Sequence, residues 1–340
     1  MRRLLRFLLL VLLIAGAALA YALLVPVQVS GSQTLLLRPG WSARRIAAEL
    51  KNAGVIRSRY AFLLLHATRM KPLKAGEYLF DHPQTAVDVY NRLERGDIYF
   101  HTVIIPEGQT MFDIAATVEA AGLGPRADFL AAAGGDTVLI KDIDPAAQSL
   151  EGYLFPDTYR FTRTQSMHDI AATMVRRFRQ EAHVLGLIQP VDSPGLEDRR
   201  DPSYVHRVVT MASIVEKETA APEERPTVAG VYFNRLQRRM PLQADPSVIY
   251  AAQLAGHYDG SIHQSDLQRE SPYNTYRFPG LPPGPIANPG RASLQAAIHP
   301  ANSDFLFFVS DAQGHHRFAK TAAEHERNVV AYRRALNGAH

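Results

Sequence analysis

The sequence predicts an α+β protein that begins with a transmembrane helix. Three observations support this prediction: an apolar run follows three arginines at the N-terminus, one strand–helix unit occurs twice, and apolar helices alternate with Gly/Pro-rich loops after residue 150. With 340 residues, the chain has room for two or three domains of roughly 100–200 residues each. We expect a cytoplasmic tail over 1–6, a transmembrane anchor over 7–27, two βα repeats over 28–150 (about 33–100 and 101–150), and a mixed α+β domain over 151–340.

The composition is that of an ordinary folded protein. Hydrophobic residues make up 46% and charged residues 21% of the chain, and the formal net charge is only +4. A charge this small gives no reason to expect a nucleic-acid partner. The sequence contains no cysteine, which excludes disulfides, thiolate catalysis and cysteine-based metal sites. No HExxH, P-loop or Rossmann pattern occurs either, so we expect no metal and no other cofactor.

The first apolar run has the length of a membrane span. Phe7 to Val27 is 21 residues without a charge, about 30 Å of helix. A cleaved signal peptide is the alternative, with Ala18-Leu19-Ala20 as its cleavage site. The run continues past this point to Val25, which favours an anchor. Because the arginines precede the helix, we expect a single-pass protein of the inner membrane, with a cytoplasmic N-terminus and the large domain in the periplasm.

An internal repeat follows the anchor, at an offset of 68 residues. In each copy a strand-like stretch leads into a glycine, and Ser42 or Thr110 then occupies the expected N-cap of an amphipathic helix. Gly54 and Gly122 are expected to end these helices in the left-handed conformation. The unit resembles the LysM module, which binds the N-acetylated sugars of peptidoglycan and chitin. A βα unit that packs without binding anything fits the pattern equally well.

Regular elements between and after the copies can also be predicted. We expect a strand over Lys74–Phe80, and helices over Thr85–Glu94 and Asp169–Leu187. The segment Glu151–Tyr159 combines three aromatic residues with Gly and Pro. It is a rigid loop, either the wall of a sugar-binding cleft or a packed corner, and by itself the pattern favours the corner. Gln189–Ser203 is expected to be a surface loop.

An apolar helix over Val208–Thr219 carries two carboxylates near its end, Glu216 and Glu218. At about 100° per residue they lie on opposite flanks of the apolar stripe, about 160° apart. They are therefore not expected to form the acid and nucleophile pair of an ordinary retaining glycosidase. One can line a cleft while the other makes a structural contact, and the periodicity does not say which.

Four blocks of sequence, taken in order, carry a family resemblance: Ala212–Thr219, Leu242–Tyr250, Tyr273–Tyr276 and Gly280–Ile286. The last two are Gly/Pro-rich or aromatic loops with amide and hydroxyl groups of the kind that bind sugars. Together the four blocks resemble the endolytic murein transglycosylases of the MltG/YceG family. The resemblance runs from the anchor to the C-terminus, where we expect a core strand over Asp304–Ser310 and a strand followed by a helix over His316–Arg334.

The resemblance implies a membrane-anchored lyase that cuts nascent glycan strands between N-acetylmuramic acid and N-acetylglucosamine. The muramyl C6 hydroxyl replaces water as the nucleophile and leaves a 1,6-anhydro end. This chemistry needs one carboxylic acid, and Glu218 is the family's catalytic position, with Glu216 as the runner-up. The expected substrate-binding residues are Gln243, Asp245, Tyr273, Asn274, Tyr276 and Glu216.

Several alternatives stay open at this point. Asp245 precedes a proline and could simply cap a helix. The expected partners are peptidoglycan glycan strands, the membrane and, by resemblance, a penicillin-binding synthase. A non-catalytic, membrane-tethered scaffold would explain the anchor and the repeats equally well. A hydrolase would differ from the lyase only in its product.

Overall fold

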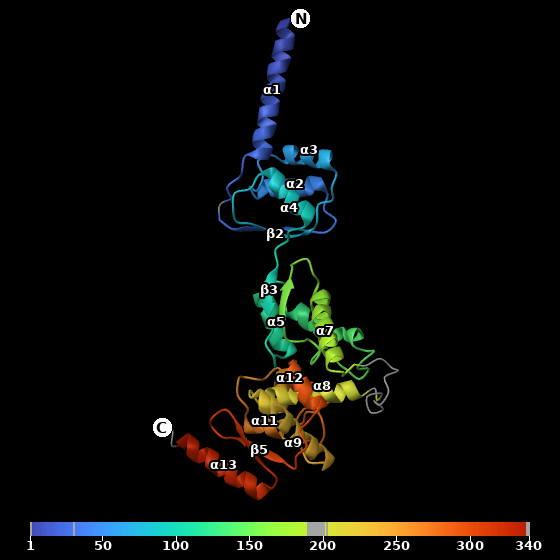
Figure 1. Ribbon diagram of the computed structural model, residues 1–340, viewed down its shortest axis with the longest axis vertical. Coiled ribbons are helices and arrows are strands. Elements are labelled where there is room, and N and C mark those ends of the chain that lie inside the picture. The colour runs from blue at the N-terminus through green and yellow to red at the C-terminus, as the bar shows by residue number, and fades with distance from the viewer. Residues whose placement is uncertain (1, 30, 189–200, 202, 338–340) are drawn as a thin grey trace. The chain divides into compact units, whose positions relative to one another are not determined.

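The structure is a computed structural model that describes residues 2–29, 31–188, 201 and 203–337 (Figure 1). It has the predicted α+β class, with helices predominating over short two-stranded sheets. In chain order the elements are α1 (Arg2–Leu24), β1 (Gln33–Leu37), α2 (Ala43–Asn52), α3 (Arg59–Arg69), β2 (Gly76–Phe80), α4 (Ala86–Arg95), β3 (His101–Ile104), α5 (Met111–Ala120), α6 (Arg126–Gly135), η1 (Thr137–Leu139), β4 (Thr158–Phe161), α7 (Met167–Val184), α8 (Tyr204–Glu218), η3 (Pro222–Glu224), α9 (Arg225–Gln237), α10 (Asp245–Leu254), α11 (Gln264–Gln268), α12 (Arg291–Ile298), β5 (Phe307–Ser310), β6 (His316–Ala319) and α13 (Ala322–Asn337).

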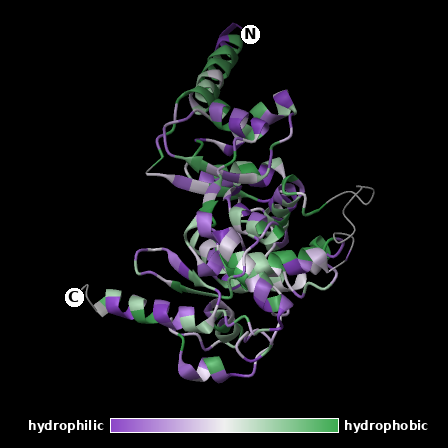
Figure 2. Ribbon diagram, turned by 60° about the horizontal axis from the view of Figure 1, so that its bottom comes forward, coloured by the Kyte–Doolittle hydropathy of each residue, from purple (hydrophilic) through white to green (hydrophobic). Residues whose placement is uncertain are grey.

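Helix α1 is apolar beyond its first turns, as its colouring in Figure 2 shows, and none of its residues is buried. Among the described residues it is the one helix long and apolar enough to cross a membrane. Its length and composition fit both a membrane anchor and a signal sequence, the two interpretations that the sequence also allows.

The chain divides into two compact units. The first comprises Met1–Thr102 and Arg160–Ser166, and the second comprises Val103–Tyr159 and Met167–His340. In the first unit, β1 pairs antiparallel with β2, so that Leu35 lies opposite Tyr78. Helices α2, α3 and α4 complete a core whose largest fully buried side chains are Phe62, Tyr78, Phe80 and Tyr90.

The internal repeat is confirmed at the level of individual caps. Helices α2 and α5 lie 68 residues apart, and the Ser42 and Thr110 side chains accept hydrogen bonds from backbone N–H groups three residues on. At Thr110, Asp113 completes a capping box by accepting from the Thr110 N–H at 2.9 Å. Gly54 and Gly122 have φ angles of 68° and 70°, the left-handed values predicted for them. Each copy continues with a second helix and a strand that pairs with the first strand, giving β1–α2–α3–β2 and β3–α5–α6–β4.

The two copies belong to different units. The sequence groups them over 28–150, whereas the structure places most of the second copy with the C-terminal part of the chain. Its closing strand, β4, lies beyond residue 150. The similarity of either copy to a LysM module stays a prediction.

The side chain of Asn288 explains why the second copy packs with the C-terminal part. This residue is fully buried, and its Oδ1 accepts hydrogen bonds from the N–H groups of Gly152 and Leu154, both at 2.9 Å. Its Nδ2 donates to the Gln109 carbonyl at 3.0 Å and to Glu151 Oε1 at 2.7 Å. One amide therefore makes four hydrogen bonds and joins three segments that are distant in sequence.

The aromatic segment Glu151–Tyr159 is a packed corner, the interpretation that the sequence pattern favours. Tyr153, Phe155 and Tyr159 are all buried, so they cannot form the wall of an open cleft. The Tyr159 hydroxyl donates to the Phe155 carbonyl at 2.6 Å, which closes the corner. The three buried aromatic side chains hold this segment in place. Its N–H groups at Gly152 and Leu154 are the ones that donate hydrogen bonds to Asn288.

Helix α8 is the central element of the second unit. It packs against α9, α10 and α12, and nine of its fifteen residues are buried.

The predicted core strand near Asp304–Ser310 needs correction: β5 pairs only with β6 in the described part of the chain, and all four of its residues are half-buried. The hairpin lies at the edge of the unit, where α13 packs on it. The predicted surface loop Gln189–Ser203 lies largely outside the described residues.

We expect the Asn288→Ala substitution to lower the free energy of unfolding of the second unit by roughly 3–5 kcal/mol, since it leaves several buried polar groups without a partner. Chemical denaturation of the full-length protein in detergent, followed by circular dichroism, measures this loss. Asn302→Ala removes an exposed amide in the same unit and is the matched control. Equal stability of the two variants would contradict this role of Asn288.

Candidate active site

A polar cleft of about 300 Å³ opens at the C-terminal end of α8. It brings together four of the predicted site residues, Glu218, Gln243, Asp245 and Tyr276, although they come from three separate segments. The other lining residues come from α9, the loop before α10, β5 and α13: Tyr232, Arg235, Leu242, Phe308, Val309, His325 and Val329. A cleft of this kind, with carboxyl, amide and hydroxyl groups converging, is suited to a polar ligand.

Glu218 is the last residue of α8, and its side chain is half-buried in the cleft wall. The buried Tyr232 hydroxyl donates to its Oε1 at 2.7 Å. Burial raises the pKa of Glu218 to about 7; the Tyr232 hydrogen bond and the charge of Arg235 oppose the rise, and the charge of Asp245 adds to it. Near neutral pH a large share of Glu218 therefore carries a proton that it can donate, and its conjugate base can accept one.

Arg235 contributes a buried positive charge to the same wall. Its Nε donates to the Leu306 carbonyl at 2.7 Å and its Nη1 to the Leu242 carbonyl at 2.6 Å. These bonds hold the segments before β5 and before α10 against α9. Arg235 lines the cleft together with Glu218, and its charge lowers the pKa of that carboxyl group.

Gln243 lies at the open rim of the cleft in an unusual conformation. Its φ of 51° is in the left-handed region, which is uncommon for a residue other than glycine. The conformation is held because the N–H groups of Gln243 and Ala244 donate to the carbonyl and the Oγ1 of the buried Thr275. Strained residues held in this way are frequent at functional sites.

Asp245 is the first residue of α10 and is exposed at the same rim. It does not cap this helix, because Ala244 is the N-cap residue and no side-chain cap is formed. Instead, the Tyr276 hydroxyl donates to Asp245 Oδ1 at 2.5 Å. A negative charge at this position is also stabilised by the N-terminal end of the helix dipole.

Glu216 is turned away from the cleft and makes a structural contact. Its side chain is 5% exposed, and it accepts hydrogen bonds from Arg225 Nη2 at 3.0 Å and from the Gly290 N–H at 2.9 Å. A Cβ at position 290 would lie 1.9 Å from the Glu107 carboxylate, so a larger residue there would require this side chain to move. The two carboxylates of the α8 terminus therefore have different roles, as their angular separation allowed.

Two further predicted site residues do not line the cleft. Asn274 is fully buried and its amide donates to three backbone carbonyls, while its Oδ1 accepts from the Tyr276 N–H at 3.0 Å. Tyr273 packs against Tyr250, with ring centroids 5.1 Å apart. Asn274 thus shapes the loop that presents Tyr276.

Four residues that line the cleft were not predicted as site residues: Tyr232, Arg235, Phe308 and His325. Tyr232 and Arg235 lie on α9, outside the four blocks that carry the family resemblance. Phe308 belongs to the predicted core strand, and His325 to the C-terminal tail. The sequence contains one signal for Tyr232 and Arg235: they are three residues apart, which places both on one face of α9. It contains none for Phe308 or His325.

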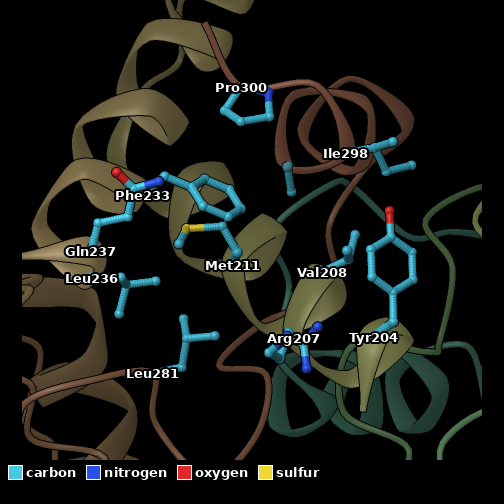
Figure 3. A pocket seen from close by; sticks show the side chains of 11 residues that line it. Tyr204, Arg207, Val208, Met211, Phe233, Leu236, Gln237, Leu281, Ile298 and Pro300 are labelled. Atoms are coloured by element: carbon cyan, nitrogen blue, oxygen red, sulfur yellow. The ribbon is translucent and has the colours of Figure 1, made fainter. Parts of the chain in front are cut away.

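A second, apolar pocket of about 360 Å³ lies between α8 and α9 (Figure 3). Its lining includes Val208, Met211, Phe233 and Leu236, with Tyr204 and Arg207 at one side. None of the described residues that line it carries a carboxylate, in contrast to the lining of the first cleft. Among the described residues, no group of three His, Asp or Glu side chains could hold a metal ion.

The fold and the polar cleft define a general acid–base enzyme with one partly buried, protonatable carboxyl group. The family model described as YceG-like family matches residues 35–331. The chain belongs to this family.

Similar proteins agree with this assignment. The chain is 32% identical over 342 residues to the endolytic murein transglycosylase of Bacillus subtilis (strain 168), covering 94% of this chain and 91% of that protein. It is 29% identical over 360 residues to the endolytic murein transglycosylase of Streptococcus pneumoniae serotype 2, but spans only 63% of that protein's length. A crystal structure of a yceG-like protein from Listeria monocytogenes matches with a TM-score of 0.58 and 30% identity, covering 87% of this chain and 98% of that chain. The predicted family and enzyme class, a lyase of the transglycosylase type, are confirmed, which leaves the non-catalytic scaffold without support.

The raised pKa of Glu218 predicts a pH-dependent effect on stability. The unfolded chain loses the Glu218 proton near pH 4.5 and the folded protein near pH 7, so wild-type stability falls between these values. Glu218→Gln removes this loss while keeping an acceptor for Tyr232. We expect its stability relative to wild type to rise by roughly 2–3 kcal/mol from pH 4.5 to pH 7 and then to level off.

Urea denaturation of both proteins across this pH range measures the effect. Taking the difference between them cancels the contribution of Glu151, whose pKa burial raises to about 8. A stability difference that does not change with pH would mean that Glu218 titrates normally in the folded protein.

Proposed function

We propose that this protein is an endolytic peptidoglycan lytic transglycosylase. It cleaves nascent glycan strands between N-acetylmuramic acid and N-acetylglucosamine, leaves 1,6-anhydro ends and so terminates strand elongation. The observation that carries the proposal is the state of Glu218: a half-buried carboxyl group with its pKa raised to about 7, which faces a polar cleft. The names of the similar proteins from Bacillus and Streptococcus support the choice of substrate.

The mechanism uses Glu218 twice. As an acid, it donates its proton to the glycosidic oxygen, and the bond from the muramyl anomeric carbon to this oxygen breaks. As a carboxylate, it then accepts the proton of the muramyl C6 hydroxyl while that oxygen bonds to the anomeric carbon. The sugar ends as a 1,6-anhydro product, Glu218 regains its proton, and no water is consumed.

The contacts of Glu218 fit both steps. Tyr232 binds Oε1, which fixes the carboxyl plane and leaves Oε2 for the proton transfer. Burial favours the protonated form before cleavage, and Arg235 and Tyr232 stabilise the carboxylate that follows it. A pKa near the working pH allows the same group to give and to take a proton.

Other residues bind and shape the substrate site in this proposal. Gln243 and Tyr276 offer amide and hydroxyl groups, and Phe308 adds an aromatic side chain to the lining. Tyr273 and Asn274 support the loop that carries Tyr276, and Glu216 holds the last turn of α8 from the other side.

In this proposal α1 anchors the enzyme in the inner membrane, with its N-terminus in the cytoplasm and the catalytic unit in the periplasm. The arginines that precede the apolar stretch support this orientation. The anchor would keep the enzyme close to strands as they are made. A penicillin-binding synthase that makes these strands is the partner that such a position implies.

Mass spectrometry of the products tests the reaction directly. We expect full-length protein in detergent to cut uncrosslinked glycan strands internally and to leave anhydromuramic acid ends. Glu218→Gln should reduce the rate by about 10³-fold or more, because it removes the only proton donor at the scissile bond. Glu223→Gln, which changes an exposed glutamate of the same unit, is the matched control.

Reducing ends in place of anhydro ends would identify a hydrolase. Full activity of the Glu218→Gln variant would overturn the assignment of the acid.

The pH dependence of kcat/KM gives a second test. Because the acid form of Glu218 must be present at the start, we expect kcat/KM to decline above about pH 7. Tyr232→Phe removes a hydrogen bond that lowers the pKa of Glu218, so the decline should move to higher pH in this variant. A profile that is flat from pH 5 to pH 9 would contradict the role of Glu218.

A further inference from the structure

We infer that Asp245 is a second functional carboxylate of the cleft, which stays ionised and stabilises the positive charge that develops at the anomeric carbon. This inference rests on the proposed function and adds an electrostatic role to it. Glu218 remains the only group that moves a proton.

The two carboxyl groups line the same cleft of about 300 Å³ but come from different elements. Glu218 ends α8 and Asp245 begins α10, and these two helices pack against each other. Within the described part of the chain, Asp245 is the one carboxylate besides Glu218 that lines the cleft. A sugar bound in this cleft would therefore contact both groups, whereas Glu216 is buried in its contact with Arg225.

The two carboxyl groups differ in burial and in their position on the helices. Glu218 is half-buried at the C-terminal end of α8, whereas Asp245 is exposed at the N-terminus of α10. The Tyr276 hydroxyl donates to Oδ1 of Asp245, and no hydrogen bond from the described residues reaches Oδ2. The arrangement leaves Oδ2 available to a ligand, and a pair of carboxyl groups in such different environments is typical of divided roles in an active site.

The charged and titratable groups that face Glu218 can be named for every neighbouring element. They are Tyr232 and Arg235 on α9, Asp245 on α10, Tyr276 on the following loop and His325 on α13. Burial lowers the pKa of His325, so this side chain is uncharged near neutral pH. The charge of Asp245 is thus the negative contribution that raises the pKa of Glu218, and Arg235 is the positive one that opposes it.

The reaction explains why such a charge is useful. When Glu218 gives its proton to the leaving oxygen, the bond to the anomeric carbon breaks and positive charge spreads over that carbon and the ring oxygen. A fixed carboxylate in a partly dehydrated cleft stabilises this charge without forming a bond. The C6 oxygen then bonds to the anomeric carbon and its proton returns to Glu218, so Asp245 is unchanged at the end.

Asp245→Asn is the test, because asparagine has nearly the same shape and can still accept the Tyr276 hydrogen bond. We expect kcat of the full-length enzyme to fall by about 10- to 100-fold, with KM changing by less than about threefold. Removing the negative charge also lowers the pKa of Glu218, so the decline of kcat/KM should move to lower pH. If Asp245 had a purely structural role, its substitution would not shift this decline, the alkaline limb of the pH profile.

Two further variants complete the experiment. Tyr276→Phe removes the hydrogen bond but keeps the charge, and we expect it to leave the alkaline limb closer to wild type than Asp245→Asn does. Asp259→Asn removes a charge from an exposed aspartate that does not line the cleft, and it should behave as wild type.

The outcomes separate the inference from the function on which it rests. Unchanged kcat and an unchanged limb in Asp245→Asn, with an inactive Glu218→Gln, would overturn the inference alone. Full activity of Glu218→Gln would overturn the proposed function itself. A covalent glycosyl adduct on Asp245, detected by mass spectrometry, would make Asp245 a nucleophile and would also refute the electrostatic role.

Discussion

The buried amide of Asn288 is the contact on which the second unit depends. Its four side-chain hydrogen bonds tie the loop before α5 and the aromatic corner to the Gly/Pro-rich loop before α12. Next to it, Lys217 Nζ donates to the Gly108 carbonyl at 3.1 Å, and Glu216 accepts from the Gly290 N–H. The last turn of α8 is thus held from one side by the second repeat. This fixed turn is what allows Glu218 to occupy one position on the other side.

The Glu-Lys-Glu sequence at the end of α8 illustrates how one helical turn can serve stability and chemistry together. Glu216 is paired and almost fully buried, so its charge is neutralised by Arg225 and contributes to packing. Glu218 points to another flank, where its contacts are a hydroxyl group and open space. Because the two side chains are about 160° apart on the helix, neither can take over the role of the other. A variant that keeps only Glu216 would therefore have no carboxyl group at the position of Glu218 in the cleft.

The elements that could be predicted from the sequence are those fixed by local chemistry. Ser42 and Thr110 act as caps and Gly54 and Gly122 end helices because these roles depend on the residue's own hydrogen bonds and φ angle. The assignment of the second repeat to the C-terminal unit depends on Asn288, more than 130 residues away from its partners at 152 and 154, and no periodicity reports such a contact. The same applies to the site. Family motifs select Glu218, Gln243, Asp245 and Tyr276, whereas Tyr232 and Phe308 become site residues only through packing of α9 and β5.

The cleft contains one carboxyl group that is partly buried, Glu218, and one that is exposed, Asp245. At the Glu218 end, burial favours an uncharged acid, whereas Asp245 is exposed at the rim, where the N-terminus of α10 stabilises a negative charge. Without this burial the pKa of Glu218 would be lower, so the group would be ionised near neutral pH and unable to donate a proton. Arg235, bonded to the carbonyls of Leu242 and Leu306, moderates the first effect so that the proton is held but can be released. In the proposed one-acid mechanism, the difference in burial between Glu218 on α8 and Asp245 on α10 would let one group donate a proton while the other stabilises positive charge.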